Sequence, residues 1–382
     1  MALTSIGPTT LNIVVPALPN LANRLASDVG TIQLIVSIYL LAMAAGQLLM
    51  GSLSDRFGRR PVLIVALSVT AGASVSAVLI STVESLIAAR ILQAVGASAG
   101  VVISRAIIRD LFDRNRAASM LGLVATVMAV VPTLGPLIGG LLETGFGWEA
   151  IFLFTAITST LVVTWAAITL PETRGLNVQH GAREGFFRDL ARLSRSARFA
   201  GFVLAGAFGS ATFFAFLGGG AHVVVTLMGR SPAEYGAWFA LSSIGYITGN
   251  FISSRLSMRY GIHRMIWAGI IIEVLGVALS TALTAFALNW GPLIVFVPQM
   301  IVNVGNGLLL PGAIAGAVSV RPQSAGTAAG ITGFTQMALG AAIAQYAGTL
   351  MADSPSALPL SILTDALAIV LVIGFAALVR RA

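Results

Sequence analysis

The residues that could carry acid–base, nucleophilic or metal chemistry are few in this chain, and they do not gather. Its 382 residues hold no cysteine, 3 histidines and 14 acidic residues. Without cysteine the chain offers no disulfide, thiolate zinc site, iron–sulfur cluster or thiol nucleophile. The histidines and acids show no metal-ligand spacing, and no phosphate-binding loop is visible. We therefore expect no enzyme activity, no metal, no cofactor and no ATP-driven step.

The basic residues point to a membrane rather than to nucleic acid. All 22 are arginine and the net charge is +8, a balance that in a water-soluble chain indicates nucleic-acid binding. Here the arginines cluster in short segments between long uncharged ones. Apolar residues make up 57% of the chain and charged residues 9%, against about 25% charged in an ordinary soluble domain. This excludes a soluble globular protein, and we expect lipid surroundings and no nucleic-acid partner.

Long uncharged stretches predict membrane-spanning helices. Crossing a hydrocarbon layer of ~30 Å takes about 20 apolar residues, and several stretches without Asp, Glu, Lys or Arg exceed that length, among them 29–54, 117–142 and 274–320. We predict an all-α membrane protein of twelve helices, with approximate limits of 1–22, 30–53, 62–82, 85–107, 117–142, 149–170, 199–223, 235–257, 264–286, 291–317, 324–348 and 358–379.

The arginines also predict the orientation of these helices, because cytoplasmic loops collect basic residues. If the first helix starts inside, the outer loops hold only Arg24 and Arg230, and all other arginines outside the spans lie on the inner side. Both termini are then cytoplasmic.

The longest polar stretch, residues 172–198, divides the chain nearly in half. We therefore predict two six-helix bundles, 1–171 and 199–382, joined by a cytoplasmic linker, which is the repeat architecture of secondary transporters. In the linker, apolar residues such as Phe186 and Leu193 beside Arg188 and Arg192 are typical of an amphipathic helix on the inner membrane surface. A solvated linker is the alternative.

A charged segment after the second predicted helix recurs, in degraded form, after the eighth. The first copy spans 51–60 and the second 255–264, so a duplicated plan is the simplest interpretation. In the first copy, Asp55 can accept amide hydrogens at the positive start of a neighbouring helix. It could thus form an inner latch, and a positive-inside loop without such a role is the alternative. The residues of this predicted inner gate are Asp55, Arg56, Arg59 and Arg60.

The 51–60 segment resembles the loop signature of the major facilitator superfamily between helices two and three. Residues 90–97, Arg-Ile-Leu-Gln-Ala-Val-Gly-Ala, are similar to its buried-arginine motif in helix four. Residues 132–140, Pro-Thr-Leu-Gly-Pro-Leu-Ile-Gly-Gly, are similar to its antiporter motif in helix five. The runs at 16–19 and 105–110 resemble those of the twelve-span drug:proton antiporters, closest to the bicyclomycin-resistance (Bcr/CflA) subfamily. In the second half of the chain the match is mainly in span pattern.

The resemblance implies a major-facilitator-type fold of two pseudo-symmetric bundles in the bacterial inner (cytoplasmic) membrane. It implies that helices one, four, seven and ten line the cavity, and that Asp55 pairs with the start of helix eleven near Ser324. It also implies an antiport role for residues of helix five that by themselves suit a bent, closely packed helix pair: Pro132, Gly135, Pro136, Gly139 and Gly140.

Arg90 is the most unusual residue within a predicted span. An arginine at a helix centre costs about 2.5–3.5 kcal/mol on translocon scales. A functional role is therefore favoured, and snorkelling from near the outer end of helix four is the alternative. Gln93 lies about one turn along and can share its hydrogen bonds. We expect both to face the interior of the amino-terminal bundle, with Asn12 or Gln33 as partners of the guanidinium.

Other polar and aromatic residues within spans are candidates for a substrate cavity. Aromatic faces suit apolar or cationic ligands, and packing is the alternative. Amides within a span need partners where there is no water, so they either bond a neighbouring helix or line a wet path. With Arg90 and Gln93, the candidate cavity residues are Asn12, Gln33, Tyr39, Phe213, Phe214, Asn303 and Asn306.

The group that would exchange a proton is not fixed by the resemblance. Where the resembled subfamily usually has an aspartate in helix one, this chain has Asn12, which cannot take up a proton. The acids well inside predicted spans are Glu273 and Asp365. Glu273 lies ten residues into helix nine, roughly 15 Å along it at 1.5 Å per residue, so depth favours it as proton carrier. The alternative is that it only bonds Ser or Thr hydroxyls inside its own bundle, because helix nine is peripheral in the resembled fold.

Together these observations predict a secondary transporter that exports small amphipathic compounds by alternating access, in exchange for protons, as in multidrug efflux and antibiotic resistance. An uptake symporter for metabolites or osmolytes is the alternative, and a membrane-embedded enzyme is a third interpretation. The direction of proton movement separates the first two. The expected partners are a small-molecule substrate, protons and membrane lipid, with the chain acting as a monomer.

Overall fold

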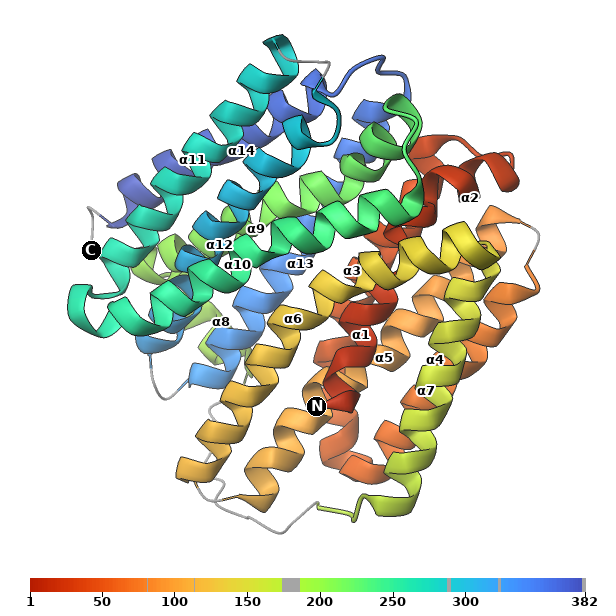
Figure 1. Cartoon of the computed structure of the whole chain (residues 1–382). Coiled ribbons are helices and arrows are strands. Elements are labelled where there is room, and N and C mark those ends of the chain that lie inside the picture. The colour runs from red at the N-terminus through yellow and green to blue at the C-terminus, as the bar shows by residue number, and fades with distance from the viewer. Residues whose placement is uncertain (81, 113, 174–185, 287–289, 322–323, 380–382) are drawn as a thin grey trace. The chain divides into compact units, whose positions relative to one another are not determined.

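The computed structural model is helical in every regular element that it describes (Figure 1); it describes residues 1–382 without 81, 113, 174–185, 287–289, 322–323 and 380–382. The elements are α1 (Ala2–Asn12), η1 (Val15–Ala17), α2 (Leu18–Arg24), α3 (Val29–Phe57), α4 (Arg59–Val78), α5 (Val83–Leu111), α6 (Arg114–Phe146), α7 (Glu149–Thr169), α8 (Phe186–Ser194), α9 (Ala197–Ala221), η2 (His222–Leu227), α10 (Pro232–Tyr260), α11 (Ile262–Phe286), α12 (Leu293–Ser319), α13 (Ala325–Ala352) and α14 (Leu358–Val379).

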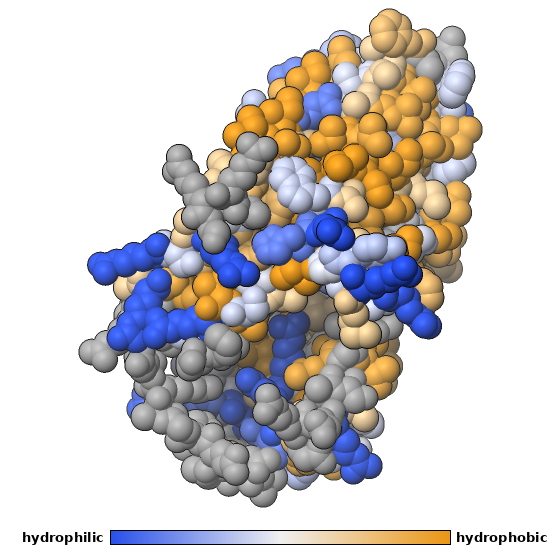
Figure 2. Space-filling model, turned by 90° about the vertical axis from the view of Figure 1, so that its left-hand side faces the viewer, coloured by the Kyte–Doolittle hydropathy of each residue, from blue (hydrophilic) through white to orange (hydrophobic). Residues whose placement is uncertain are grey.

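Eight of the described helices are long and apolar enough to cross a membrane: α3, α4, α5, α7, α9 with η2, α11, α12 and α14. The remaining predicted spans correspond to α1 with α2, to α6, to α10 and to α13. Large apolar side chains such as those of Leu79, Ile168 and Phe286 are exposed. Figure 2 shows hydrophobic residues over much of the face in view, with hydrophilic ones gathered toward its lower part. Helices suit lipid because their backbone groups pair within one segment.

The first predicted span, 1–22, is not one helix, which corrects the sequence-based limits. α1 ends at Asn12, the 3₁₀ turn η1 surrounds Pro16, and α2 continues from Leu18. Proline lacks an N–H and its ring restricts the preceding turn, so the α-helical hydrogen-bond pattern is interrupted here. Thr9 still accepts from the Ile13 N–H at 2.9 Å, but the carbonyls after it in the last turn of α1 are left without partners in their own helix.

The segment predicted as a loop at 54–61 is also helical on both sides. α3 continues through Asp55 and Arg56 to Phe57, and α4 begins at Arg59. Only Gly58 separates the two helices, with φ at +103°. Glycine adopts this conformation without the steric cost that a Cβ would add, so one residue is enough to reverse the chain.

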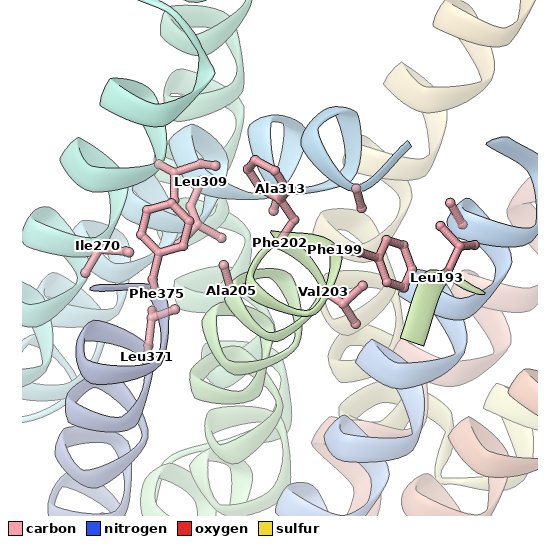
Figure 3. Packing of buried hydrophobic residues seen from close by; sticks show 13 residues of the cluster. Leu193, Phe199, Phe202, Val203, Ala205, Ile270, Leu309, Ala313, Leu371 and Phe375 are labelled. Atoms are coloured by element: carbon pink, nitrogen blue, oxygen red, sulfur yellow. The ribbon is translucent and has the colours of Figure 1, made fainter. Parts of the chain in front are cut away.

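The chain divides into two compact units. Unit 1 comprises 1–180 and 230–237, and unit 2 comprises 181–229 and 238–382. In unit 1, α4, α5 and α7 bury a core that includes Leu63, Leu67 and Ile103. In unit 2, Phe202 of α9 and Phe375 of α14 pack in a core with residues of α11 and α12 (Figure 3).

Within the predicted linker the structure describes one short helix, α8. Its Leu193 is 1% exposed and belongs to the core of unit 2 beside Phe199 (Figure 3). Leu193 thus packs against protein, and a position of this helix on the membrane surface stays a prediction. Arg192 of the same helix is exposed. Residues 174–185 and the side chains of 186–189 lie outside the described residues.

Candidate substrate site and inner gate

A buried guanidinium is the centre of the polar site in unit 1. Arg90 of α5 is 1% exposed. Its Nε donates to the carbonyl of Ile35 at 3.1 Å, and its Nη1 donates to the carbonyl of Thr10 at 2.9 Å. Thr10 lies in the last turn of α1, where carbonyls lack helical partners and the helix dipole is negative. The break after Asn12 therefore supplies the acceptor that holds the arginine.

Gln93 and Tyr39 complete this site. Gln93 accepts from Arg90 Nη1 at 3.0 Å and donates to the hydroxyl of Ser74 at 2.8 Å, so α4 and α5 share one polar network. The ring of Tyr39 lies 4.1 Å from Arg90 Cζ, and its hydroxyl donates to the carbonyl of Gly7 at 3.0 Å. A cation over an aromatic face is most stabilising when both are desolvated. α1, α3, α4 and α5 thus meet at Arg90.

The prediction that Asn12 or Gln33 binds the Arg90 guanidinium was wrong. Asn12 donates to the carbonyl of Pro8 in its own helix at 2.8 Å. Neither it nor Gln33 contributes a described hydrogen bond to the guanidinium; backbone carbonyls do so instead. Among the residues that the structure describes, Arg90 Nη2 and Gln33 Nε2 are buried without a partner. These donors can bind a carbonyl, hydroxyl or anionic group of a ligand.

The glycines of the helix-five motif bring α6 into backbone contact with the end of α1. A β-carbon at Gly135 would lie 2.9 Å from the Cβ of Asn12, and one at Gly139 would collide with the carbonyl oxygen of Ile13. Gly140 faces Pro232 in the same close way, in the turn of α10 that belongs to unit 1. Pro132 and Pro136 both lie inside α6. The motif is therefore a flat packing surface in this structure.

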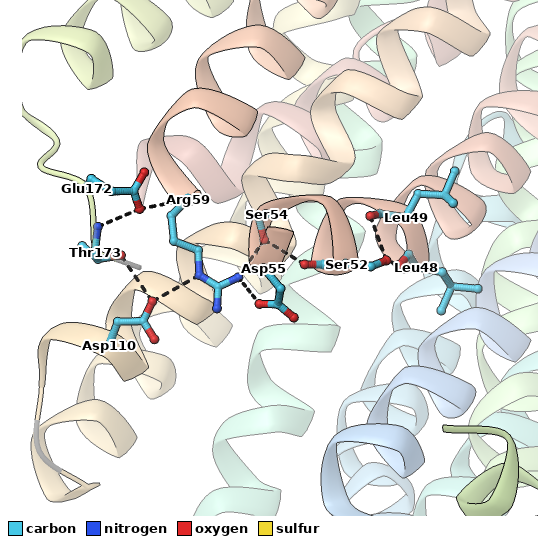
Figure 4. A network of polar contacts seen from close by, with 10 residues as sticks. Leu48, Leu49, Ser52, Ser54, Asp55, Arg59, Asp110, Glu172 and Thr173 are labelled. Carbon is cyan, nitrogen blue, oxygen red and sulfur yellow. Dashed lines mark hydrogen bonds and ion pairs between the residues drawn. The ribbon is translucent and has the colours of Figure 1, made fainter. Parts of the chain in front are cut away.

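The predicted inner gate is an ion-pair network centred on Arg59 (Figure 4). Its guanidinium donates to Asp55, to the Ser54 hydroxyl at 2.7 Å and to Asp110 at 3.2 Å. Asp110 also accepts from the Thr173 hydroxyl at 3.3 Å. The network joins α3, α4, α5 and the segment after α7. Arg56 lies outside it and packs over the ring of Phe57 at 5.2 Å.

Glu172 is the residue of this region that sequence reasoning missed. Its carboxylate accepts from the backbone N–H groups of Arg59 at 2.9 Å and Arg60 at 3.2 Å, and so caps the start of α4. Arg60 in turn donates to the carbonyl of Ala167 at 2.6 Å. A carboxylate at a helix start was predicted for Asp55 and helix eleven. That pairing would join the two units and stays a prediction, whereas Glu172 makes such a contact within unit 1.

In unit 2 the candidate residues contact one another and their neighbours. Phe213 packs against Phe214 with ring centroids 5.6 Å apart, and also against Phe239 at 6.1 Å. Asn303 donates to the carbonyl of Ser242 at 3.1 Å and accepts from Gln299 at 3.1 Å. The contacts of Phe213, Phe214 and Asn303 in this structure are therefore ring packing and hydrogen bonds between helices.

The two candidate proton carriers both bind threonine hydroxyls. Thr212 of α9 donates to Glu273 at 2.8 Å, and Thr281 donates to Asp365 at 2.5 Å. Glu273 is 0% exposed. The alternative drawn from the sequence, that Glu273 bonds a hydroxyl inside its bundle, describes this contact, but the contact alone does not decide between that role and proton exchange. Asn306 donates to the same Thr212 hydroxyl at 3.4 Å.

One sequence motif of hydrolytic enzymes occurs in this chain without the local structure that the motif requires. Residues 96–100 read Gly-Ala-Ser-Ala-Gly, the spacing of a nucleophile elbow, which needs a sharp turn after a strand and an exposed hydroxyl. Here Ser98 is buried inside α5, and its hydroxyl donates to the carbonyl of Val95 at 2.7 Å. The small residues instead admit α3, because a β-carbon at Gly46 would lie 2.6 Å from the Ser98 hydroxyl.

Comparison with known proteins agrees with this arrangement. The family model described as Major Facilitator Superfamily matches residues 1–345. Multidrug resistance protein D of Escherichia coli is 30% identical over 338 residues, covering 87% of this chain and 83% of that protein. The bicyclomycin resistance protein homolog of Haemophilus influenzae is 26% identical over 381 residues, covering 99% and 94%. A solved bacterial homolog of the human lysosomal transporter Spinster superposes with a TM-score of 0.78 at 15% identity, covering 99% of this chain and 94% of that one.

These matches confirm the resemblance drawn from the motifs and the fold class predicted with it. Multi-pass architecture and bacterial relatives indicate the inner membrane, and transporters of this family bind small molecules within the membrane. The chain is a transport protein rather than an enzyme, and it belongs to the Major Facilitator Superfamily.

Proposed function

We propose that this transporter exports small amphipathic compounds, drugs among them, across the bacterial inner membrane in exchange for protons. The relatives named for multidrug and bicyclomycin resistance support this substrate class. The arginine-rich loops support cytoplasmic termini. In this proposal the functional halves are 1–171 and 199–382, the linker is 172–198, and a single chain in contact with lipid works by alternating access.

The observation that carries the proposal is the Arg90 site. A guanidinium in apolar surroundings is costly, and this one is held in place by two backbone carbonyls and Gln93 while Nη2 stays without a partner among the described residues. The Tyr39 ring lies on its face. This combination offers a substrate a hydrogen-bond donor beside an aromatic surface, which suits an amphipathic molecule with one polar acceptor.

The contact between α6 and the end of α1 links this site to the helix-five motif. Gly135 and Gly139 pack on Asn12 and Ile13, and the Thr10 carbonyl that binds Arg90 lies in the same turn of α1. A shift of α6 would therefore move the acceptor of the buried arginine. We assign the motif to the coupling of substrate binding with helix movement, and the network around Arg59 to an inner gate.

Transport into everted membrane vesicles tests the proposal. A pH-sensitive dye reports the acid interior, and bicyclomycin, chloramphenicol and cationic dyes are added in turn. Antiport is expected to release protons when a substrate enters the vesicle, whereas a symporter would move substrate and protons in the same direction. Proton release by no compound of the panel, or symport, would contradict the proposal.

Variants assign the activity to the site. Arg90→Ala is expected to abolish the response, and Arg90→Lys to lose most of it because an ammonium cannot reproduce the planar fork that bonds two carbonyls. Arg230→Ala is the matched control, since Arg230 is exposed and pairs with Glu234 at 3.8 Å. Equal effects of Arg90→Ala and Arg230→Ala, at equal membrane abundance, would contradict the role of Arg90.

A further inference from the structure

In unit 2, one oxygen atom of the buried Glu273 carboxyl group has a hydrogen-bond partner and the other has none among the described residues. Glu273 Oε1 accepts from Thr212 at 2.8 Å, whereas Oε2 is buried without a partner among the described residues. Asn306 Oδ1 is a second buried acceptor without a donor there. Asn306 Nδ2 bonds the Thr212 hydroxyl at 3.4 Å. Each of these buried acceptors needs either a proton or a donor molecule.

The helices around Glu273 place no described cation beside it. α12 has no charged or titratable residue. Arg198 lies in the first turn of α9, and His222 is the first residue of η2, directly after α9. On α11 itself, His263 and Arg264 lie in the first turn. Asp365 of α14 is bonded to Thr281, about two turns farther along α11. An unpaired carboxylate in such surroundings is strongly disfavoured, so the group is expected to carry a proton.

A small cavity begins beside Thr212 and lies between α9, α11, α12 and α14. Its volume is about 30 Å³, space for roughly two water molecules. Apolar residues form part of its wall, and its polar lining consists of Thr212, Ser280, Thr284, Gln299, Ser361 and Thr364.

The residues of α11 that line the cavity, Val277, Ser280 and Thr284, lie on the same helix face as Glu273. Glu273, Val277, Ser280 and Thr284 are spaced by four, three and four residues, so they share one face of the helix. This stripe of residues is roughly 16 Å long at 1.5 Å per residue and ends two residues before the last residue of α11, Phe286. Glu273 lies at the inner end of this stripe, and Thr212, which lines the cavity, donates to its carboxyl group.

The hydroxyls of this lining are arranged to accept hydrogen bonds from water. Thr284 donates to the Ser280 carbonyl at 2.6 Å, and Thr364 donates to the Ser361 carbonyl at 2.7 Å. The Thr284 and Ser361 hydroxyls lie 3.1 Å apart, across α11 and α14. With their hydrogens directed to carbonyls, the oxygen lone pairs are left for water. These oxygens can hold water molecules in place, and a proton could pass from one such water to the next.

We propose that Glu273 binds the exchanged proton and that this hydroxyl-lined cavity is its access route, running inside unit 2 toward the end of α11 near Thr284. The proposal rests on proton exchange as the proposed function. On release, the proton leaves Oε2 for a cavity water, which becomes hydronium and passes a proton onward. The carboxylate that remains keeps the hydrogen bond from Thr212, a positioning residue. Substrate and proton then bind in different units, at Arg90 and at Glu273.

Carbodiimide labelling tests the proton site without any substrate. Dicyclohexylcarbodiimide reacts with protonated carboxyl groups in apolar surroundings, and peptide mass spectrometry locates the adduct. We expect labelling at Glu273 that declines as pH rises, and no adduct at this position in Glu273→Gln. In Thr212→Val labelling should persist to higher pH, because the ionised form loses its hydrogen bond. A role for Thr212 in packing alone would leave the pH profile unchanged.

Silver-ion accessibility tests the route, and the cysteine-free chain makes each introduced thiol unique. In protein embedded in lipid nanodiscs, Ser280→Cys and Thr284→Cys should react about tenfold or more faster than Ile271→Cys, a factor equal to about 1.4 kcal/mol in activation free energy. Ile271 is the matched control because it lies on the same helix with its side chain exposed on the surface. Two further variants separate filling of the route from misfolding. Thr284→Leu should slow silver access to Ser280→Cys, which lies deeper along α11, and Ala278→Leu, on the exposed face, should not.

The outcomes are distinct from those of the transport assay. No adduct at Glu273 at any pH overturns the proton site, protection by Na⁺ at fixed pH reassigns it to a metal cation, and cavity cysteines no faster than Ile271→Cys overturn the route. If labelling and silver access behave as expected but vesicles show no exchange, the proposed function fails and the protonatable site with its access route stands.

Discussion

Gly139→Ala tests whether the helix-five motif is a packing surface between α6 and α1. A β-carbon at Gly139 would collide with the Ile13 carbonyl oxygen and lie 2.8 Å from the carbonyl carbon. Both are backbone atoms, so no side chain can turn away and α6 must move off α1. Overpacking of this kind costs about 1–3 kcal/mol. At about 2–4 °C per kcal/mol for units of this size, the melting temperature should fall by roughly 2–12 °C.

Gly72→Ala is the matched control, because Gly72 lies within α4 and nothing lies within 4 Å of a β-carbon there. Removing a mid-helix glycine is worth about 0.5–1 kcal/mol, so this variant should melt at or slightly above the parent temperature. A single reporter cysteine at the buried position Ala99 and a thiol-activated fluorophore report unfolding in detergent. If Gly139→Ala melts with the parent or with Gly72→Ala, the close contact of α6 with α1 is refuted.

Three further predictions concern the Glu172 cap of α4, the Asp28 cap of α3 and the Tyr39 ring beside Arg90. Glu172→Ala should speed hydrogen exchange of the first two amides of α4 by about 2- to 30-fold, the range that cap losses of 0.5–2 kcal/mol represent, and unchanged exchange would contradict the cap. Hydrogen bonds from the Thr31 side chain and backbone hold the pKa of Asp28 below its usual range. The stability that ionised Asp28 gives the folded protein is therefore present above a pH of about 3.9, and it is lost as pH falls through the lower pKa of the folded state. Asp28→Ala should remove that part of the decline in melting temperature at acid pH. Tyr39→Phe keeps the ring over Arg90 and should retain efflux, whereas Tyr39→Leu should lose it, and equal activities would contradict a role for the ring.

The spans were predictable because lipid imposes a coarse rule on composition. Any stretch that crosses the membrane must be long and uncharged, so the limits of α7 and α14 agree closely with those predicted. Two boundaries failed where a single residue decided the path. Gly58 reverses the chain between two continuous helices, and Pro16 interrupts the first span. Charge counting does not detect such local backbone effects.

The sequence identified the residues of the Arg90 site better than it identified their hydrogen-bond partners. Arg90 and Gln93 stood out because a charge and an amide are rare within a span, and the structure places them 3.0 Å apart. The carbonyl partners of Arg90 could not be foreseen, since every residue has a carbonyl and only the end of α1 decides which one is available. Glu172 reaches α4 across more than 110 residues of chain, a separation that local pattern does not address.

The junction of α3 and α4 has a mechanical consequence. The Glu172 carboxylate occupies the space that a side chain at position 58 would need, with its Oε2 atom 2.5 Å from a β-carbon built at Gly58. The same carboxylate bonds α4, and Arg60 ties α4 back to the last turns of α7. The end of α3, the start of α4 and the end of α7 are therefore cross-linked, so a tilt of one of these helices at this point would displace the other two. Relative movement of these three helix ends is thereby opposed by the Glu172 and Arg60 contacts, whereas no such cross-link is needed to break α1, which ends at Asn12 before the turn around Pro16.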